Sequence, residues 1–422
     1  MNDFFRPRSE LSTTQTEVWI QNTSEILGEA IMDSVSSVRD SLPKEHRAHF
    51  ETLRQEIIDF TKAHGISRES LGKPDLLREV TSKLSTQDLE RLALLLERFE
   101  HLLIRKEPKE ITDSLEYVEE FYHLREQYTS QVSLLEQVGI LENGVITGID
   151  GHEYPVPTFE QIAIRLFERR ETLETKHDQG FTKLLLVPFG MSLDTLTDTL
   201  KQFLLKYKSD DPDFDLDINE PLLVWEDYQG ADTGDFPKLV YEPQSFTKDG
   251  HGGKTKREIL REQEDNQDSF PGWIVHLLQP SNPSNLHSPG FVSIPREGRG
   301  IPQGDFVPRH PLEAGKSPDE YLSILQKAQG DKDSPYHGET GMTPEDWIMA
   351  FMIHFQETGE LLDDVWNPSN TESHCFLTGA FFPFSVVVPG AYWCGSFHFV
   401  SLDKDAPLEM DFYRGVRSSV MI

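Results

Sequence analysis

The chain has 422 residues, and its 72 Asp and Glu against 40 Lys and Arg give a formal net charge of −32 at pH 7. Such acidity disfavours binding to nucleic-acid phosphates and to anionic membrane surfaces. The 26 Phe and 6 Trp are enough for hydrophobic cores, and the length favours roughly two or three domains. Two cysteines, Cys375 and Cys394, are too few for a disulfide scaffold or a cysteine-ligated zinc site.

The sequence shows no targeting or membrane-spanning segment. The first residues lack the basic region followed by an apolar stretch that a secretion signal requires. No apolar run reaches the roughly 18 residues that a bilayer span needs. We therefore expect a cytoplasmic protein by default, with no nucleic-acid partner and no membrane insertion, and we leave surface display by another route open.

The first third of the chain is predicted to be helical. Residues 44–63 and 85–104 carry apolar side chains at steps of three and four, and a further helix is expected over 110–136. Ser85 is placed to cap the second of these helices. We expect residues 1–139 to form a helical region that serves as a bundle or as a docking arm, with homo-oligomerisation as one option.

Residues 140–250 are expected to form a small mixed α/β module. Asn143-Gly144 is a strong two-residue hairpin signal, and Asp150-Gly151 offers a second turn. Thr158 followed by Gln161 is a reciprocal helix cap. The predicted order is a β-hairpin, a helix after Thr158, a buried strand that ends at Pro188 and a helix over 192–207.

Residues 251–422 are predicted to form a third domain with a lead-in at 279–316 that is rich in Pro, Gly, Ser and Asn and therefore loop-like. Two capped helices follow, after Ser317 and after Thr343. Each has proline at its first helical position and an acidic side chain three residues after the cap. Gly359 is expected to end the second helix. Beyond it the pattern changes to short β-like runs with aromatic residues and turns.

Two motifs are similar to ligand-binding loops but lack residues that such loops need. Residues 251–255 (HGGKT) end like a phosphate loop, yet Lys248 stands where the first glycine is required, so we expect a turn into a helix. Residues 210–217 alternate carboxylates like a calcium loop. Leu216 and Leu222 occupy the positions of the required glycine and glutamate. We expect a solvated acidic loop, with a weak cation site as the alternative.

No spacing of residues supports catalysis. The histidines are scattered without an HExxH motif, and no G-x-S-x-G elbow occurs. His354 lies on the apolar helix after Thr343 and is expected to be a satisfied core residue. Asp363 and Asp364 form a carboxylate pair of a kind that is usually found on surfaces. We therefore predict no catalytic residue, no metal site and no cofactor, and we expect that the protein is not an enzyme.

The most informative pattern lies within residues 374–422. Its characteristic residues, in chain order, are Leu377, Gly379-Ala380-Phe381-Phe382-Pro383, Val388-Pro389, Ala391-Tyr392-Trp393 and Gly415-Val416-Arg417-Ser418. This pattern resembles the variable target proteins of diversity-generating retroelements, in the form common among uncultured small-genome bacteria. Residues 312–318 and 341–347 are similar to the lead-in of the same group, so the resemblance covers about 250–422. The ending is also similar to the closing strand of the formylglycine-generating-enzyme type of C-type lectin fold.

The resemblance implies an α+β protein with a helical N-terminal region, a small mixed α/β module and a C-terminal C-type-lectin-like domain over 251–422. That domain would bind an unidentified protein or glycan without catalysis, through a hypervariable surface. In the family, adenines of a template repeat are misread, so AAC codons become NNC codons, which never encode Lys, Glu, Gln, Met or Trp. Lys404, Glu409 and Met410 would then be fixed positions. The residues expected on the variable surface are Gly390, Cys394, Gly395, Ser396, Phe397, His398, Phe399, Ser401, Asp403, Asp405, Ala406, Pro407, Leu408, Asp411 and Phe412.

The character of the residues points in the same direction. Residues 394–399 show neither strand alternation nor a helical period, which a fold tolerates where side chains face solvent or a ligand. Arg417 is expected to tie down the terminus. Because Cys394 falls at a variable position, a disulfide with Cys375 is not expected. The core is expected to come from Val388, Pro389, Tyr392, Trp393, Val400, Tyr413, Val416 and Val420.

Two alternatives from other functional classes remain. The first is an enzyme of the formylglycine-generating type or an unrelated hydrolase, which a bound metal or a cluster of buried polar groups would favour. The absence of a defined copper-binding cysteine pair weighs against the former. The second is a structural protein whose N-terminal helices assemble oligomers.

Overall fold

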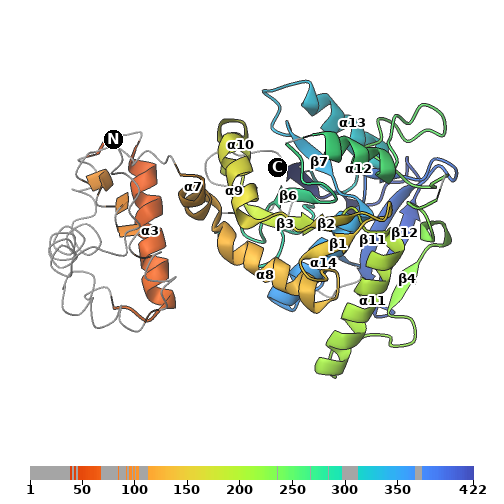
Figure 1. The fold of residues 1–422 in the computed structure, drawn as a ribbon, viewed down its shortest axis with the longest axis horizontal. Coiled ribbons are helices and arrows are strands. Elements are labelled where there is room, and N and C mark those ends of the chain that lie inside the picture. The colour runs from red at the N-terminus through yellow and green to blue at the C-terminus, as the bar shows by residue number, and fades with distance from the viewer. Residues whose placement is uncertain are drawn as a thin grey trace. The chain divides into compact units, whose positions relative to one another are not determined.

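The computed structural model describes residues 39, 42–43, 46–67, 84, 92, 95–96, 98–99, 101–103, 113–234, 236–266, 268–283, 285–296, 312–365 and 373–422. The chain divides into two compact units, Met1–Ile111 and Thr112–Ile422. Both units and their elements are drawn in Figure 1. Helices and strands both occur, which confirms the α+β class. Among the described residues, none of the helices combines the length and the apolar character that a membrane span requires.

In the first unit, α3 (Arg47–Ala63) confirms the helix predicted over 44–63. It buries Phe50, Leu53 and Ile57, which lie three and four residues apart, in a small core. The Phe50 ring stacks on Phe99 with 5.3 Å between centroids. The residues described between 92 and 103 are helical, as expected for that segment, whereas the cap predicted at Ser85 lies outside the described residues.

The second unit begins with two helices where one was predicted over 110–136. They are α7 (Ser114–Tyr122) and α8 (Leu124–Gln137), and His123 separates them in a left-handed conformation with φ 46°. Asp113 caps α7 by accepting hydrogen bonds from two backbone N–H groups. The two helices do not share one buried face, since Val118 and Tyr122 lie four residues apart whereas the buried Leu124 follows Tyr122 after only two residues.

Local signals predict most of the next segment, although the structure has a further helix, α10, between the predicted helix after Thr158 and the predicted strand. Asn143 and Gly144 both have positive φ, as a two-residue hairpin turn requires, and Glu142 pairs with Val145 across them. Thr158 and Gln161 form a complete capping box. The elements are β1 (Val145–Thr147), β2 (Glu153–Pro155), α9 (Phe159–Glu168), α10 (Arg170–Asp178), β3 (Lys183–Val187) and α11 (Leu193–Asp210).

The helix caps predicted in the last part are confirmed too. Ser317 and Thr343 each form a capping box, and Gly359 ends the second helix with φ 69°. The helices are α12 (Lys256–Asp265), α13 (Pro318–Gln329), α14 (Pro344–Thr358) and the short 3-10 helix η3 (Glu226–Tyr228). The strands are β4 (Leu222–Val224), β5 (Val240–Tyr241), β6 (Ile274–Leu278), β7 (Glu339–Gly341), β8 (Asp364–Val365), β9 (His374–Phe376), β10 (Ala380–Phe381), β11 (Val388–Cys394), β12 (Phe399–Asp405), β13 (Arg414–Gly415) and β14 (Ser418–Met421).

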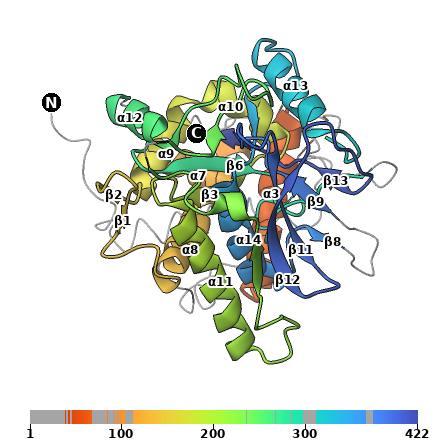
Figure 2. The same cartoon turned by 90° about the vertical axis from the view of Figure 1, so that its right-hand side faces the viewer.

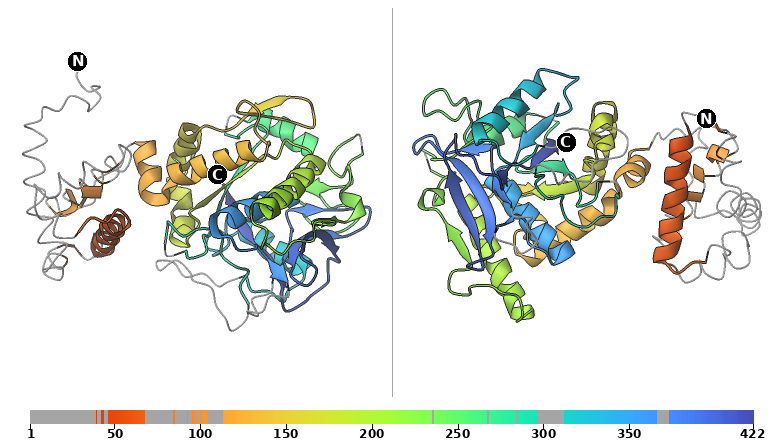
Figure 3. Two further views of the ribbon diagram at one scale, coloured as in Figure 1. Left: turned by 90° about the horizontal axis from the view of Figure 1, so that it is seen from below. Right: turned by 180° about the vertical axis from the view of Figure 1, so that it is seen from behind.

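Two larger sheets and one buried helix form the centre of the second unit. A 4-stranded antiparallel sheet has the order β3-β6-β14-β7, and a 6-stranded mixed sheet has the order β13-β9-β11-β12-β4, with β8 paired to β11. Helix α14 contacts both β3 and β11, so it lies between the sheets (Figure 2 and Figure 3). Its residues from Pro344 to Phe355 are all buried. This helix joins the two sheets into one core.

The structure does not divide at the predicted boundaries of 139/140 and 250/251. Strand β4 pairs with β12 and β5 pairs with β10, so the predicted 140–250 module contributes strands to sheets of the C-terminal part. Helix α8 also packs on β3. The reason is physical: two- and three-residue strands cannot form a separate stable sheet and need partners elsewhere in the chain.

Candidate functional site

The hairpin of β11 and β12 is the main feature of the segment that the sequence singles out. The strands pair over their whole length, ending with Cys394 opposite Phe399, and residues 395–398 form the turn. Side chains alternate between two faces along each strand. We call the face that carries Trp393 the inner face and the face that carries Tyr392 the outer face.

The inner face belongs to the core of the second unit. Trp393, Val400 and Leu402 are at most 2% exposed and pack in the large cluster around α14. At the edge of this face, the Lys404 ammonium lies 4.2 Å from the centre of the Trp225 ring. Of the predicted core residues, Val388, Pro389, Trp393, Val400, Val416 and Val420 are buried, whereas Tyr392 and Tyr413 are half-buried.

The outer face carries a buried polar cluster. His374 Nε2 lies 2.8 Å from Asp405 Oδ2, and Arg414 donates to both Asp405 and Glu409 at 2.5 Å. Gly390 is required here, because a Cβ at this position would lie 2.2 Å from the Asp405 carboxylate. The cluster therefore links β9, β12 and β13 and holds the end of the hairpin in place.

Tyr392 covers this cluster on the solvent side. Its ring stacks on His374 with 4.8 Å between centroids, and its hydroxyl lies 3.5 Å from Asp403 Oδ2. Burial raises the pKa of Tyr392, so the phenol stays neutral in the physiological range. A half-buried aromatic ring with a neutral hydroxyl is suited to contact a ligand.

The turn of the hairpin carries the first exposed group among the predicted site residues. We call Gly395, Ser396, Phe397, His398 and Phe399 the tip group. Phe397 is 67% exposed, and its ring stacks on Phe399 with 6.1 Å between centroids. His398 has φ 60°, and its Nδ1 lies 3.3 Å from Asp215 Oδ2. The tip group therefore presents aromatic rings beside a carboxylate.

The segment after β12 carries the second exposed group, Ala406, Pro407, Leu408, Asp411 and Phe412, which we call the loop group. Leu408 is 76% exposed and Phe412 is 67% exposed. The two groups lie at opposite ends of β12, about 20 Å apart at ~3.3 Å per strand residue. The structure therefore does not bring the predicted residues into one cluster.

Four predicted site residues are not on the surface. Gly390 and Cys394 are buried in β11, and Ser401 and Asp405 are at most 1% exposed in β12. The polar cluster and the Tyr392 ring fill this part of the outer face. Asp403, between the latter two, is half-buried. These four buried residues cannot contact an external ligand without rearrangement of the hairpin.

Sequence reasoning missed several surface residues around the hairpin. The sequence prediction puts Tyr392 in the core. Alternate residues of a strand share a face, so Tyr392 lies on the same face as Gly390 and Cys394, which were predicted for the variable surface. This alternation could have placed Tyr392 on the outer face. Leu223 is 39% exposed in β4 opposite Ser401. No local signal places β4 there. No local signal places the predicted acidic loop beside the hairpin turn either. It contacts the turn there, since the Asp217 N–H donates a hydrogen bond to the His398 carbonyl.

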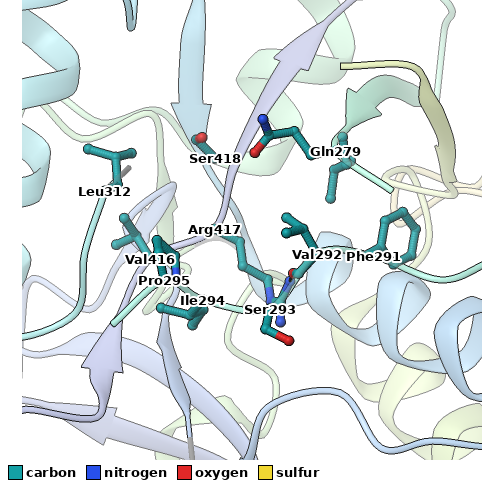
Figure 4. A pocket seen from close by; sticks show the side chains of 11 residues that line it. Gln279, Phe291, Val292, Ser293, Ile294, Pro295, Leu312, Val416, Arg417 and Ser418 are labelled. Carbon is teal, nitrogen blue, oxygen red and sulfur yellow. Dashed lines mark hydrogen bonds between the residues drawn. The ribbon is translucent and has the colours of Figure 1, made fainter. Parts of the chain in front are cut away.

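A small pocket lies beside β14 and is shown in Figure 4. Apolar side chains such as Phe291, Ile294 and Leu312 line it together with Arg417. The Arg417 guanidinium donates to both carboxylate oxygens of Asp363 and to the Val292 carbonyl. The lining includes the hydroxyls of Ser293 and Ser418, but no His, Cys, Asp or Glu that could act as a general base is among its residues.

Three residues with the chemistry of a hydrolase triad do meet in the core. Ser419 Oγ lies 3.2 Å from His276 Nδ1, and His276 Nε2 lies 3.2 Å from Asp346 Oδ1. All three side chains are at most 2% exposed, so a substrate cannot reach the hydroxyl. Asp346 also caps α14 by accepting from the Thr343 N–H. These bonds tie β6, β14 and α14 together.

The two cysteines do not form a pair. Cys375 lies opposite Ala391, on the inner face, whereas Cys394 lies on the outer face. Both are buried and free. Their thiols therefore point to opposite sides of the sheet and do not converge on one metal ion, as a copper site of the formylglycine-generating type requires.

The other motifs are part of the structural framework. Thr255 caps α12, and Lys254 pairs with Glu262, so residues 251–255 lead into a helix as predicted. His354 is 7% exposed and accepts from the Phe291 N–H, which confirms it as a satisfied core residue. Asp363 was expected on the surface but is fully buried against Arg417. This ion pair holds the segment before β14 in place, as expected for Arg417. Within the part of the chain that the structure describes, the carboxylates of 210–217 form no group of metal-ligand geometry.

Comparison with known proteins adds no further constraint. No protein-family model, no curated protein and no solved structure matches the chain. A functional interpretation therefore depends on the geometry and chemistry of the site.

Proposed function

We propose that the second unit is a non-catalytic ligand-binding protein with a C-type-lectin-like C-terminal part. In this proposal the tip and loop groups form a changeable surface that a retroelement diversifies. The observation that carries it is the division of the hairpin, whose inner face is packed in the core while both of its ends present exposed aromatic and polar side chains. A scaffold of this kind can change its ligand without losing its fold.

The energetics of the two faces support this division of roles. Substitutions at exposed positions such as Phe397 and Leu408 are expected to change stability by no more than about 0.5 kcal/mol. Truncation of Trp393 on the inner face would cost about 3–5 kcal/mol. The binding surface and the folding core are therefore nearly independent, although they are built from the same two strands.

The exposed chemistry suits a protein or glycan surface as ligand. Phe397 and Phe412 offer large rigid rings of the type that dominates binding energy at interfaces. Asp403 in β12 accepts hydrogen bonds, and Asp215 lies beside the hairpin turn, 3.3 Å from His398 Nδ1. These carboxylates, together with the net charge of −32, favour ligands that present hydrogen-bond donors or positive charge.

The structure narrows the set of changeable residues that we propose. The tip and loop groups and Asp403 remain in it, because they are exposed or half-buried. Gly390, Cys394, Ser401 and Asp405 are proposed as fixed positions of the scaffold. Arg414 and His374 would be fixed with them, because they complete the polar cluster around Asp405.

Two matched libraries test this assignment. NNC codons are introduced at Ser396, Phe397, Leu408 and Phe412 in one library, and at the four buried positions in the other. Protease resistance on the cell surface of yeast then reports the folded fraction. We expect most members of the first library and few members of the second to stay folded. Equal folded fractions in the two libraries would refute the division into display and scaffold positions.

Selection of the first library against two defined probes, hen lysozyme and mannan, tests the binding role itself. Enriched clones should lose binding when the tip group is changed back to its parental residues and the selected loop group is kept. They should also lose binding when the loop group is changed back and the selected tip group is kept. Failure to enrich any clone from a well-folded library would count against a binding surface. Sequencing of the natural locus tests the retroelement: a reverse transcriptase gene and an imperfect repeat with mismatches at template adenines are expected.

A further inference from the structure

Three potential metal ligands meet on the surface of the second unit, remote in sequence from the hairpin. Asp150 and His152 lie in the loop between β1 and β2, and Glu264 lies in the last turn of α12. His152 Nδ1 is 3.1 Å from Glu264 Oε1 and 3.7 Å from Asp150 Oδ2. One ligand atom from each residue lies within 4.8 Å of both others.

These separations match those of a tetrahedral metal site. Nitrogen and carboxylate oxygen bind Zn²⁺ at about 2.0–2.2 Å. Ligand atoms at the corners of a tetrahedron of that size are about 3.3–3.6 Å apart. The two distances from His152 Nδ1 bracket this range, so small side-chain rotations suffice to place a metal ion at the centre.

A buried tyrosine orients the two carboxylates. The Tyr154 hydroxyl donates to Asp150 at 2.6 Å and lies 3.4 Å from Glu264 Oε1. The Tyr154 ring occupies space that three glycines leave open. A Cβ would lie 2.3 Å from the ring at Gly272, 2.6 Å at Gly148 and 3.2 Å at Gly190. Metal ligands are usually held by such outer hydrogen bonds, which set their orientation before the ion binds.

The local charge favours a cation as well. Glu264 lies at the C-terminus of α12, where the helix dipole is negative, and the last turn contains no basic side chain. Asp265 adds a further carboxylate to this turn. The side chain of His152 is 64% exposed, so an ion can enter from solvent without opening the fold.

We propose that Asp150, His152 and Glu264 bind a divalent transition-metal ion of the zinc class, with the remaining coordination position filled by water. The ion would join the β1–β2 loop to α12. One histidine and two carboxylates form a mixed nitrogen and oxygen ligand set, which zinc-class ions accept and which differs from the all-oxygen sites that Ca²⁺ prefers.

Titration of the full chain with Zn²⁺ tests this proposal. After treatment with EDTA and its removal by gel filtration, calorimetry should show one saturable Zn²⁺ site, and Zn²⁺ should raise the melting temperature. We expect H152A and E264Q each to weaken binding at least tenfold, and Y154F to weaken it about tenfold through loss of orientation. Ca²⁺ in place of Zn²⁺ should bind much more weakly.

The matched control is E262Q, which removes a carboxylate from the same helix but not from the site, since Glu262 pairs with Lys254. It should bind Zn²⁺ like the parent protein. Circular dichroism checks that each variant is folded. If H152A is not folded, the comparison of Zn²⁺ affinity with the parent protein uses E264Q alone. Equal Zn²⁺ affinity of the parent, H152A and E264Q would overturn the proposal, as would the absence of saturable binding in the parent.

Discussion

Individual buried residues hold the C-terminal strand to the core. Arg417 forms a two-pronged ion pair with Asp363, and Asp363 also accepts hydrogen bonds from Trp347 and Ser373. Burial alone would raise the pKa of Asp363, but the guanidinium and these hydrogen bonds outweigh it and lower the pKa. The carboxylate therefore stays charged, and loss of Arg417 would leave it unpaired in the core.

His354 should make stability depend on pH. Burial, with a smaller contribution from Arg417, lowers the pKa of His354 to about 4 in the folded protein. In the unfolded chain its pKa is about 6.5. Between pH 4 and 6.5 the unfolded state therefore binds more protons than the folded state. The contribution of His354 to the free energy of unfolding is fully present above pH 6.5 and is lost as the pH falls toward 4. That contribution amounts to about 3 kcal/mol.

Urea denaturation at several pH values between 4 and 7 checks this prediction. The variant H354Q retains an acceptor for the Phe291 N–H but does not titrate. Its free energy of unfolding should therefore fall less steeply with decreasing pH than that of the parent, by up to about 3 kcal/mol over the interval. Parallel profiles for the two proteins would show that His354 is not the group responsible.

At the scale of elements, α8 closes the free edge of the 4-stranded sheet. The Gln131 side chain donates to the Leu184 carbonyl and accepts from the Leu186 N–H. One helical turn earlier, the Gln127 side chain donates to the Thr182 carbonyl and accepts from the Leu184 N–H. These side-chain amides satisfy backbone groups of β3 that a neighbouring strand would otherwise pair. An exposed edge of this kind is a site of aggregation in many proteins.

Replacement of Gln131 by leucine should therefore destabilise the second unit. The change keeps the side-chain volume similar but leaves one N–H and one carbonyl of β3 buried and unpaired, at a cost of about 3 kcal/mol. Chemical denaturation measures the loss, and hydrogen exchange should show faster exchange at the Leu186 amide. Q137L on the exposed face of the same helix is the matched control, and a Q131L variant as stable as this control would contradict the assigned role.

At the scale of the whole molecule, the chain comprises two units rather than three domains. The division after Ile111 places α7 and α8 with the sheets, whereas the sequence suggests a boundary near residue 140. We therefore expect the fragment 112–422 to fold by itself. The fragment 140–422, which follows the predicted boundary at 139/140, lacks α8 and should unfold at much lower denaturant concentration or aggregate.

Expression of the two fragments and their denaturation side by side test this expectation. The shorter fragment exposes the edge of β3 and the apolar face against which Leu134 and Leu135 pack. Equal stability of both fragments would show that α7 and α8 are not part of the folding unit. Light scattering on the fragment 1–111 then tests whether the first unit forms the homo-oligomer that its helices suggest.

The hairpin shows how far a candidate site can be predicted from sequence. The turn with Phe397 is exposed, as predicted from the lack of an apolar period in residues 394–399, whereas Cys394 of the same segment is buried. The burial of Ser401 and Asp405 could not be predicted. The burial of Asp405 depends on His374 and Arg414, which approach from other strands of the sheet.

The sequence by itself determined the parts of this protein that depend on neighbours within a few residues. The capping boxes at Thr158, Ser317 and Thr343, the Asn143-Gly144 turn and the end of α14 at Gly359 all follow from bonds or backbone angles of that range. Only the tertiary structure decided which short strands share a sheet, where the units divide, and that Asp150 and His152 meet Glu264. The contact between His152 and Glu264, for example, joins residues 112 positions apart. Such pairings are selected by the burial and hydrogen bonding of the whole unit, which no local pattern encodes.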